Sequence, residues 1–143
     1  MEQSLKQLLL KDLSARLPYG VICQFIWTYS NETTDGESVI AKKDDNIKCI
    51  NIHIEEIQAD YYDEWVDLEH CKPYLRPMSS MTEEELKTFY KIEDMEHPVI
   101  WNIPQPNWHF SIDGIDWLLS KQFDFRGLIE KGLALEASEG MYN

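Results

Sequence analysis

One stretch constrains the fold more than any other, Lys-Pro-Tyr-Leu-Arg-Pro-Met-Ser-Ser-Met-Thr-Glu-Glu-Glu at residues 72–85. Its two prolines, Pro73 and Pro77, fix φ and favour extended backbone at the residues before them, so a helix cannot start there. Thr82 and Glu85 have the spacing of a capping box, in which each side chain bonds to the backbone N–H of the other. The stretch therefore predicts an extended entry and then a helix that begins directly after the threonine.

The three consecutive glutamates at residues 83–85 also raise the alternative of a cation site. Successive residues of a helix point about 100° apart, so these carboxylates would not converge on one ion. The positive end of a helix dipole favours negative charge in the first turn. We therefore interpret the glutamates as part of a helix start.

The chain before this stretch is typical of one helix followed by a meander of strands. Leucines recur with helical spacing over Ser4–Leu17, and Ser4 and Gln7 offer a capping box. Strand patterns then occupy three segments, separated by polar turns at 30–36 and 42–46. These segments are Val21–Trp27, Ser38–Ala41 and Ile47–Glu55.

The chain after it is predicted to be largely helical. A helix over Glu83–Ile92 is followed by a short strand at Val99–Trp101. We predict a further helix capped by Asp113, with Ile112 and Trp117 as its hydrophobic staple. A last helix is predicted from Asp124, ending at Gly132, which fits the left-handed position after a helix.

Together these patterns predict an α+β fold in a single domain over residues 1–143. We expect an antiparallel sheet of about four or five strands, an N-terminal helix packed on it, and two to three C-terminal helices. No internal repeat or long linker divides the chain.

Charge is the one unusual bulk property: 13 basic residues stand against 26 acidic ones, which gives a net charge of −13. Residues 28–70 hold three basic and twelve acidic residues, a net charge of −9. This sign opposes contact with nucleic-acid phosphates, so we expect no direct nucleic-acid binding. It suits docking on a basic protein surface, although solubility alone would also explain it.

Cysteine usage and hydropathy indicate the compartment. Cys23, Cys49 and Cys71 are odd in number, widely spaced and without a Cys-x-x-Cys pair. No apolar run reaches membrane-spanning length, and the N-terminus lacks the basic start of a signal peptide. We expect a reduced, cytoplasmic protein that does not contact a membrane.

The histidines give no catalytic or metal motif. His53, His70, His97 and His109 form neither His-x-x-x-His nor His-Glu-x-x-His, so no metal site and no cofactor are predicted. A Cys71 nucleophile with His97 or His109 as its base, brought together by the fold, stays open as a minor alternative. No catalytic residue is assigned.

Two candidate surfaces remain. The first is an acidic and aromatic patch made of Tyr61, Tyr62, Asp63, Glu64 and Trp65. Such a mixture occurs at protein-binding surfaces. The alternative is that Tyr62 and Trp65 close the end of the core, since such rings usually bury most of their area.

The second is a cleft built from His70, Cys71, Tyr74 and Arg76. The capping interactions leave Arg76 and Tyr74 unexplained, so these two residues lead this hypothesis.

Three blocks carry a resemblance to a known family. They are Leu-Pro-Tyr-Gly-Val at 17–21, the stretch at 72–85, and Phe-Asp-Phe-Arg-Gly-Leu-Ile-Glu-Lys-Gly-Leu-Ala-Leu-Glu-Ala at 123–137. In these blocks the chain resembles a family of small uncharacterised proteins from gut Bacteroidetes, often encoded near prophages and other mobile elements. The resemblance implies a bacterial cytoplasmic setting and a phage- or mobile-element-linked role. It implies no activity, so no residue role is carried over.

The leading hypothesis is therefore a small acidic, non-enzymatic protein-interaction module whose partner is a protein with a basic surface. One alternative is an enzyme or small-ligand-binding protein with a cleft near residues 70–76. The other, which follows from charge alone, is an acidic decoy of a DNA-binding protein.

Overall fold

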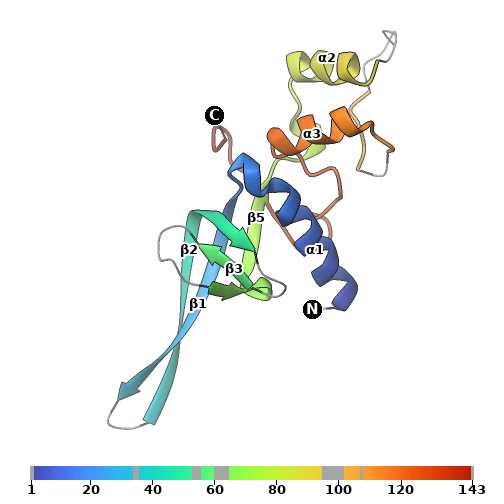
Figure 1. Ribbon diagram of the computed structural model, residues 1–143. Helices are drawn as coiled ribbons and strands as arrows, with labels where there is room; N and C mark the ends of the chain where they lie inside the picture. The colour runs from blue at the N-terminus through green and yellow to red at the C-terminus, as the bar shows by residue number, and fades with distance from the viewer. Residues whose placement is uncertain are drawn as a thin grey trace. The chain divides into compact units, whose positions relative to one another are not determined.

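The computed structural model describes residues 2–33, 36–52, 56–59, 65–94, 102–106 and 108–142, with backbone only for parts of 27–66 (Figure 1). The chain divides into two compact units, Met1–Tyr74 (unit 1) and Leu75–Asn143 (unit 2). The architecture is a mixed α+β arrangement with an N-terminal helix, a sheet and two further α-helices. The expected α+β class is confirmed, and the single domain stays a prediction.

Unit 1 begins with α1, Gln3–Arg16, followed by the short 3-10 helix η1, Leu17–Tyr19. The helix start is not the predicted capping box, because Glu2 is the N-cap and no side chain caps it. Gly20, with φ of 70°, ends η1 in the left-handed conformation, where glycine carries no Cβ penalty.

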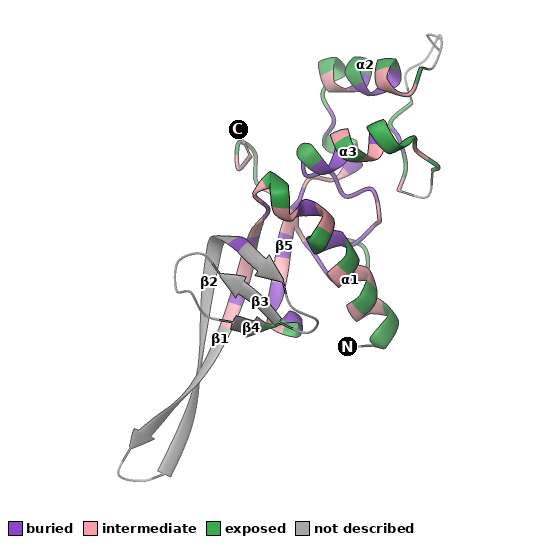
Figure 2. Cartoon of the chain, viewed as in Figure 1, coloured by how far each residue is buried: buried purple, intermediate pink, exposed green. Residues whose placement is uncertain are grey.

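One side of α1 is buried, and half of that side is charged. Its buried residues are Leu9, Asp12, Leu13 and Arg16, which follow helical spacing. Figure 2 shows the buried part of α1 in purple. Arg16 Nε donates to Asp12 Oδ2 at 2.7 Å and Arg16 Nη2 donates to Asp12 Oδ1 at 3.2 Å. Both side chains have 0% exposure, so unit 1 encloses an intact ion pair.

The sheet is antiparallel through unit 1. Its strands there are β1 Ile22–Thr33, β2 Gly36–Ile52, β3 Glu56–Ala59, β4 Trp65–Asp67 and β5 Cys71–Leu75. The 3-10 helix η2, Leu68–His70, lies between β4 and β5 in the sequence. The strand order is β4-β3-β2-β1-β5-β6, in which β6 is a two-residue strand of unit 2. The number of strands is not the four or five that the sequence predicted.

The β1–β2 ribbon, formed by these two long strands paired with each other, differs most from the sequence prediction. The expected turn at 42–46 lies inside the single long strand β2. Of the expected turn at 30–36, residues 30–33 belong to β1 and Gly36 begins β2. β1 and β2 stay in register from Ile22 opposite Lys48 to Thr33 opposite Gly36, with one irregularity between Cys23 and Phe25. Continuous cross-strand pairing thus overrides the local turn signals of polar residues.

The core of unit 1 includes alternate residues around the start of β1 and along β5. Val21, Cys23 and Phe25 have 0% exposure, and β5 alternates between buried and half-buried positions, as a sheet with one covered face does. At the surface, Lys6 of α1 forms an ion pair with Glu69 of η2 at 3.1 Å.

Unit 2 contains the 3-10 helix η3 Met78–Ser80, then α2 Glu83–Ile92, α3 Ile112–Ser120 and β6 Leu135–Glu136. Its core is aromatic. Phe89 lies edge-on to Phe110 with ring centroids 5.7 Å apart, and Trp117 stacks on Phe123 at 5.8 Å. The strand expected at Val99–Trp101 falls outside the described residues.

The predicted cap of α3 is wrong. Ser111, not Asp113, is the N-cap, and its hydroxyl accepts a hydrogen bond from Gly114 N at 3.0 Å. Glu93 completes the cap by accepting bonds from both the backbone N–H and the hydroxyl of Ser111. Ile112 is 80% exposed, so it forms no buried staple.

The predicted last helix is also absent, because residues 124–132 form turns. The buried carboxylate of Asp124 accepts from Leu128 N at 2.8 Å and from Ile129 N at 2.9 Å, four and five residues ahead. A helix N-cap bonds two or three residues ahead instead, so this aspartate holds a compact loop. Gly132 has the predicted left-handed φ, 73°.

Candidate functional site: the Arg76 pocket of unit 2

The capping box predicted at the start of α2 is confirmed. Thr82 Oγ1 accepts from Glu85 N, and Thr82 N donates to Glu85 Oε1, each at 3.1 Å. Met81, just before the cap, and Leu86, at the fourth position of the helix, are both buried. The Glu83 and Glu84 carboxylates lie in the first turn beside them. The helix start is therefore built as the sequence indicates.

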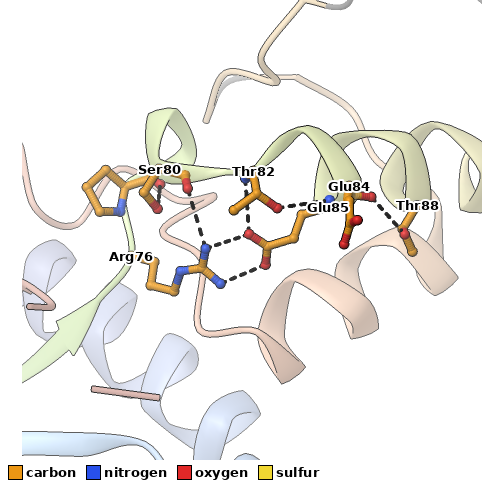
Figure 3. Close-up of polar contacts among 7 residues, drawn as sticks. Arg76, Ser80, Thr82, Glu84, Glu85 and Thr88 are labelled. Carbon is orange, nitrogen blue, oxygen red and sulfur yellow. Dashed lines mark hydrogen bonds and ion pairs between the residues drawn. The ribbon is translucent and has the colours of Figure 1, made fainter. Parts of the chain in front are cut away.

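Arg76 joins the capping box to the segment before it (Figure 3). Its Nη1 donates to Glu85 Oε2 at 2.8 Å and its Nη2 donates to Glu85 Oε1 at 2.7 Å, a bidentate pair. Nη2 also reaches the Ser80 carbonyl at 3.5 Å. One Glu85 oxygen thus serves both the helix cap and the guanidinium.

This arrangement changes the acidity of Glu85. Hydrogen bonds from Arg76 hold the pKa of the Glu85 carboxyl below its ordinary value, and the bond from Thr82 adds to the effect, while partial burial opposes it. A carboxyl whose pKa is lowered on folding stabilises the folded state above its unfolded pKa, and this contribution disappears as the pH falls through the folded pKa.

We therefore expect Glu85→Gln to destabilise unit 2 at neutral pH and progressively less under acid conditions. Urea unfolding of wild type and variant across an acid pH series measures the gap between them. The gap should narrow below the ordinary glutamate pKa and close below the lowered one. A gap that stays constant with pH would show that the carboxylate charge is not what matters. Glu84→Gln, on an exposed neighbour, is the matched control.

A contact with an aromatic ring and two backbone hydrogen bonds also hold Arg76 in place. Its guanidinium carbon lies 4.2 Å from the centroid of the Phe123 ring, within the range of a cation–π contact. Its N–H donates to the Gln122 carbonyl and its carbonyl accepts from Asp124 N, both at 2.8 Å. Arg76 therefore connects the start of α2 with the loop that follows α3.

A pocket of about 670 Å³ opens beside this arginine. Its walls come from the segment 76–85, from the end of α3 at Ser120 and Lys121, and from residues 136–142 after β6 begins. The volume falls within the usual 300–1,000 Å³ of ligand pockets. All of these residues belong to unit 2.

The predicted cleft is divided between the two units. Arg76 lines the pocket, whereas His70, Cys71 and Tyr74 belong to unit 1 and do not line it. Cys71 is buried, and the Tyr74 hydroxyl accepts a bond from Gln24 Nε2 at 3.4 Å. Whether these four residues act together stays a prediction.

Most of the predicted acidic and aromatic patch falls outside the described residues. Tyr61, Tyr62, Asp63 and Glu64 lie outside the described residues, and Trp65 is described only as the first residue of β4, where it pairs with Gln58. His53 and His97 are likewise outside the described residues. His109 is described and exposed.

All three cysteines are buried free thiols. Burial raises the pKa of the Cys23 thiol well above its ordinary value, and a hydrogen bond with Cys71 adds to the rise. Because the thiolate is the reactive form, we expect native protein to react slowly with a thiol reagent such as iodoacetamide. Mass spectrometry should show all three cysteines labelled quickly in urea. Fast native labelling of Cys23 would contradict its buried position.

Sequence reasoning missed several residues that build the pocket. Lys121, Glu136 and Glu139 lie far from the predicted cleft in sequence, and no local pattern marks them. Asp124, whose backbone N–H bonds to the Arg76 carbonyl, was predicted only as the start of a helix that does not form. The residue that indicated this site in the sequence was Arg76. The predicted capping interactions did not use its guanidinium, and a partly buried guanidinium needs a partner.

Comparison with known proteins found no match: no family model, no curated protein and no solved structure matches the chain. Over the residues that the structure describes, no helix is long and apolar enough to cross a membrane. In the same residues, no three histidine, cysteine or acidic side chains gather as metal ligands do.

Proposed function

We propose that this chain is an acidic, non-enzymatic protein-interaction module that docks on a protein with a basic surface. The observation that carries the proposal is the backbone of the β1–β2 ribbon. β1 pairs with β5 only over Cys23–Phe25, and β2 pairs with β3 only over Cys49–Ile52. Among the described strands, the outer part of the ribbon therefore pairs only within itself.

An isolated two-stranded ribbon is marginally stable in water. Its open edges present main-chain N–H and C=O groups that can pair with a strand of another protein. Added pairing along β1 or β2 would complete the ladder, which supports a docking role for this ribbon.

Charge supports the choice of a basic partner. The chain carries a net charge of −13, which favours association with a positive surface. The register pairs Glu32 with Glu37 near the end of the ribbon, and like charges at opposed positions weaken a two-stranded ladder. A basic partner would relieve this repulsion.

The test is a capture experiment on immobilised full chain in lysate of a gut Bacteroidetes host, at low salt and at 1 M salt, where the Debye length is about 3 Å. We expect a basic protein to bind at low salt and to be released at high salt. The variant Glu32→Lys/Glu37→Lys should no longer capture this protein. The matched control Asp116→Lys/Glu130→Lys changes the same charge at exposed positions of unit 2. Equal loss in both variants, or no salt-sensitive capture, would overturn the proposal.

We include a bacterial, reducing cytoplasm in the same proposal as the compartment of the protein. A bacterial, reducing cytoplasm is what the resemblance of the three sequence blocks implies, and three buried free thiols are compatible with it. A second candidate function, ligand binding near residues 70–76, draws support from the pocket beside Arg76.

A further inference from the structure

The charges that line the unit 2 pocket are only partly satisfied within the protein. Arg76 and Glu85 neutralise each other through their bidentate pair. Lys121, Glu136 and Glu139 are exposed, and the described part of the chain gives none of the three an ion pair. Two carboxylates and one ammonium group therefore face the pocket, an acidic balance that matches the charge of the chain.

The pocket also lies along a strand edge. β6 is the last strand in the order of the sheet. The N–H of Ala137, the next residue, donates to the Leu75 carbonyl of β5 at 2.8 Å. Because main-chain groups of successive extended residues point to opposite edges, those of Glu136 point away from β5. Glu136, Ala137 and Ser138 all line the pocket.

We propose that this pocket binds an extended peptide segment with basic side chains, laid along the outer edge of β6. The Glu136 backbone would pair with the main chain of the peptide, the mode in which a strand is added to a sheet edge. The Glu136 and Glu139 carboxylates would pair with its lysine or arginine side chains. Arg76 positions the wall, since its guanidinium is already held by Glu85 and Phe123.

Other ligand chemistry fits less well. A nucleotide or phosphorylated ligand would bring two or more negative charges to a pocket with one available cation, Lys121, and two available carboxylates. An apolar ligand would leave the three charges, Lys121, Glu136 and Glu139, without partners. A basic peptide satisfies the carboxylates and the strand edge together.

This inference concerns a site in unit 2 and goes beyond docking through the ribbon of unit 1. The probe is the peptide Ser-Lys-Val-Lys-Ser-amide with fluorescein on its N-terminal amine, titrated with full-length protein and followed by fluorescence anisotropy at low salt. Two further probes replace both lysines by glutamate, or the central valine by proline, which removes one main-chain N–H.

We expect the lysine peptide to bind and the glutamate peptide not to bind. Glu136→Gln/Glu139→Gln should weaken binding about tenfold, since two charge-assisted contacts together contribute on the order of one factor of ten. The control Asp116→Asn/Glu130→Gln, with the same charge change at exposed positions outside the pocket, should change binding less than about twofold. Lys121→Gln should strengthen it, because it removes a like charge from the wall.

The proposal fails if the lysine peptide does not bind, if the glutamate peptide binds as well, or if the control weakens binding as much as the pocket variant. Equal affinity for the proline peptide would overturn the strand-addition geometry. The ribbon variant Glu32→Lys/Glu37→Lys should keep peptide binding, so failure at the pocket and failure of ribbon docking are separate outcomes. Unchanged circular dichroism of each variant shows that it folds.

Discussion

Arg16→Met should lower the free energy of unfolding of unit 1 by about 3–5 kcal/mol, the usual effect of removing one partner of a buried ion pair. The variant would leave the Asp12 carboxylate fully buried without its bidentate partner, 2.7 Å away in the wild type. Methionine fills similar volume, so the loss would come from uncompensated charge and not from a cavity. Urea unfolding followed by circular dichroism measures the change.

The matched controls separate charge from packing. Lys11→Met, at an exposed position of the same helix, should change stability by less than about 0.5 kcal/mol. The double variant Asp12→Leu/Arg16→Met removes both charges and should recover most of the loss, because apolar residues can replace a buried pair at little net effect. A double variant as unstable as Arg16→Met alone would show that other contacts of these side chains dominate.

Phe123→Ala should destabilise unit 2 by about 3–5 kcal/mol, as is usual for truncating a buried aromatic ring. Phe123 has 0% exposure, stacks on Trp117, and supports the Arg76 guanidinium. The variant would open a cavity and remove the surface on which Arg76 rests. Urea unfolding gives the size of the effect.

Trp108→Ala is the control, because this aromatic residue of the same unit is 38% exposed. It should be much milder than Phe123→Ala. Phe123→Leu should lie between them, since it keeps apolar volume and loses only the ring contacts. If Phe123→Leu is as severe as Phe123→Ala, the ring contacts outweigh the cavity, and the Arg76 contact is then the first to test.

The sequence predicted best where the determining interactions are local. Thr82 and Glu85 lie three residues apart, so the cap of α2 follows from the residues themselves. The same reasoning failed at α3, because Glu93, eighteen residues before Ser111, bonds to Ser111 and strengthens a cap two residues before the expected Asp113. No local pattern reveals such a partner.

Tertiary pairing explains the other differences. Residues 42–46 look like a turn alone, but pairing with β1 keeps Lys42 and Lys43 in one continuous strand. Asp124 looks like a helix cap, but its burial and its bonds to Leu128 and Ile129 make a loop instead. The pocket was predictable only through Arg76, since residues 136–142 reach it through the pairing of β6 with β5.

The backbone bridge at Arg76 has a consequence for how unit 2 opens in solution. The amides of Arg76 and Asp124 are held by carbonyls nearly fifty residues away along the chain, so fraying of either helix end would not free them. Their hydrogens would exchange with deuterated water only when the unit opens as a whole. These two amides are therefore internal reporters of the global stability of unit 2. They differ from the Thr82 amide, whose hydrogen bond to the Glu85 side chain lies at an exposed position.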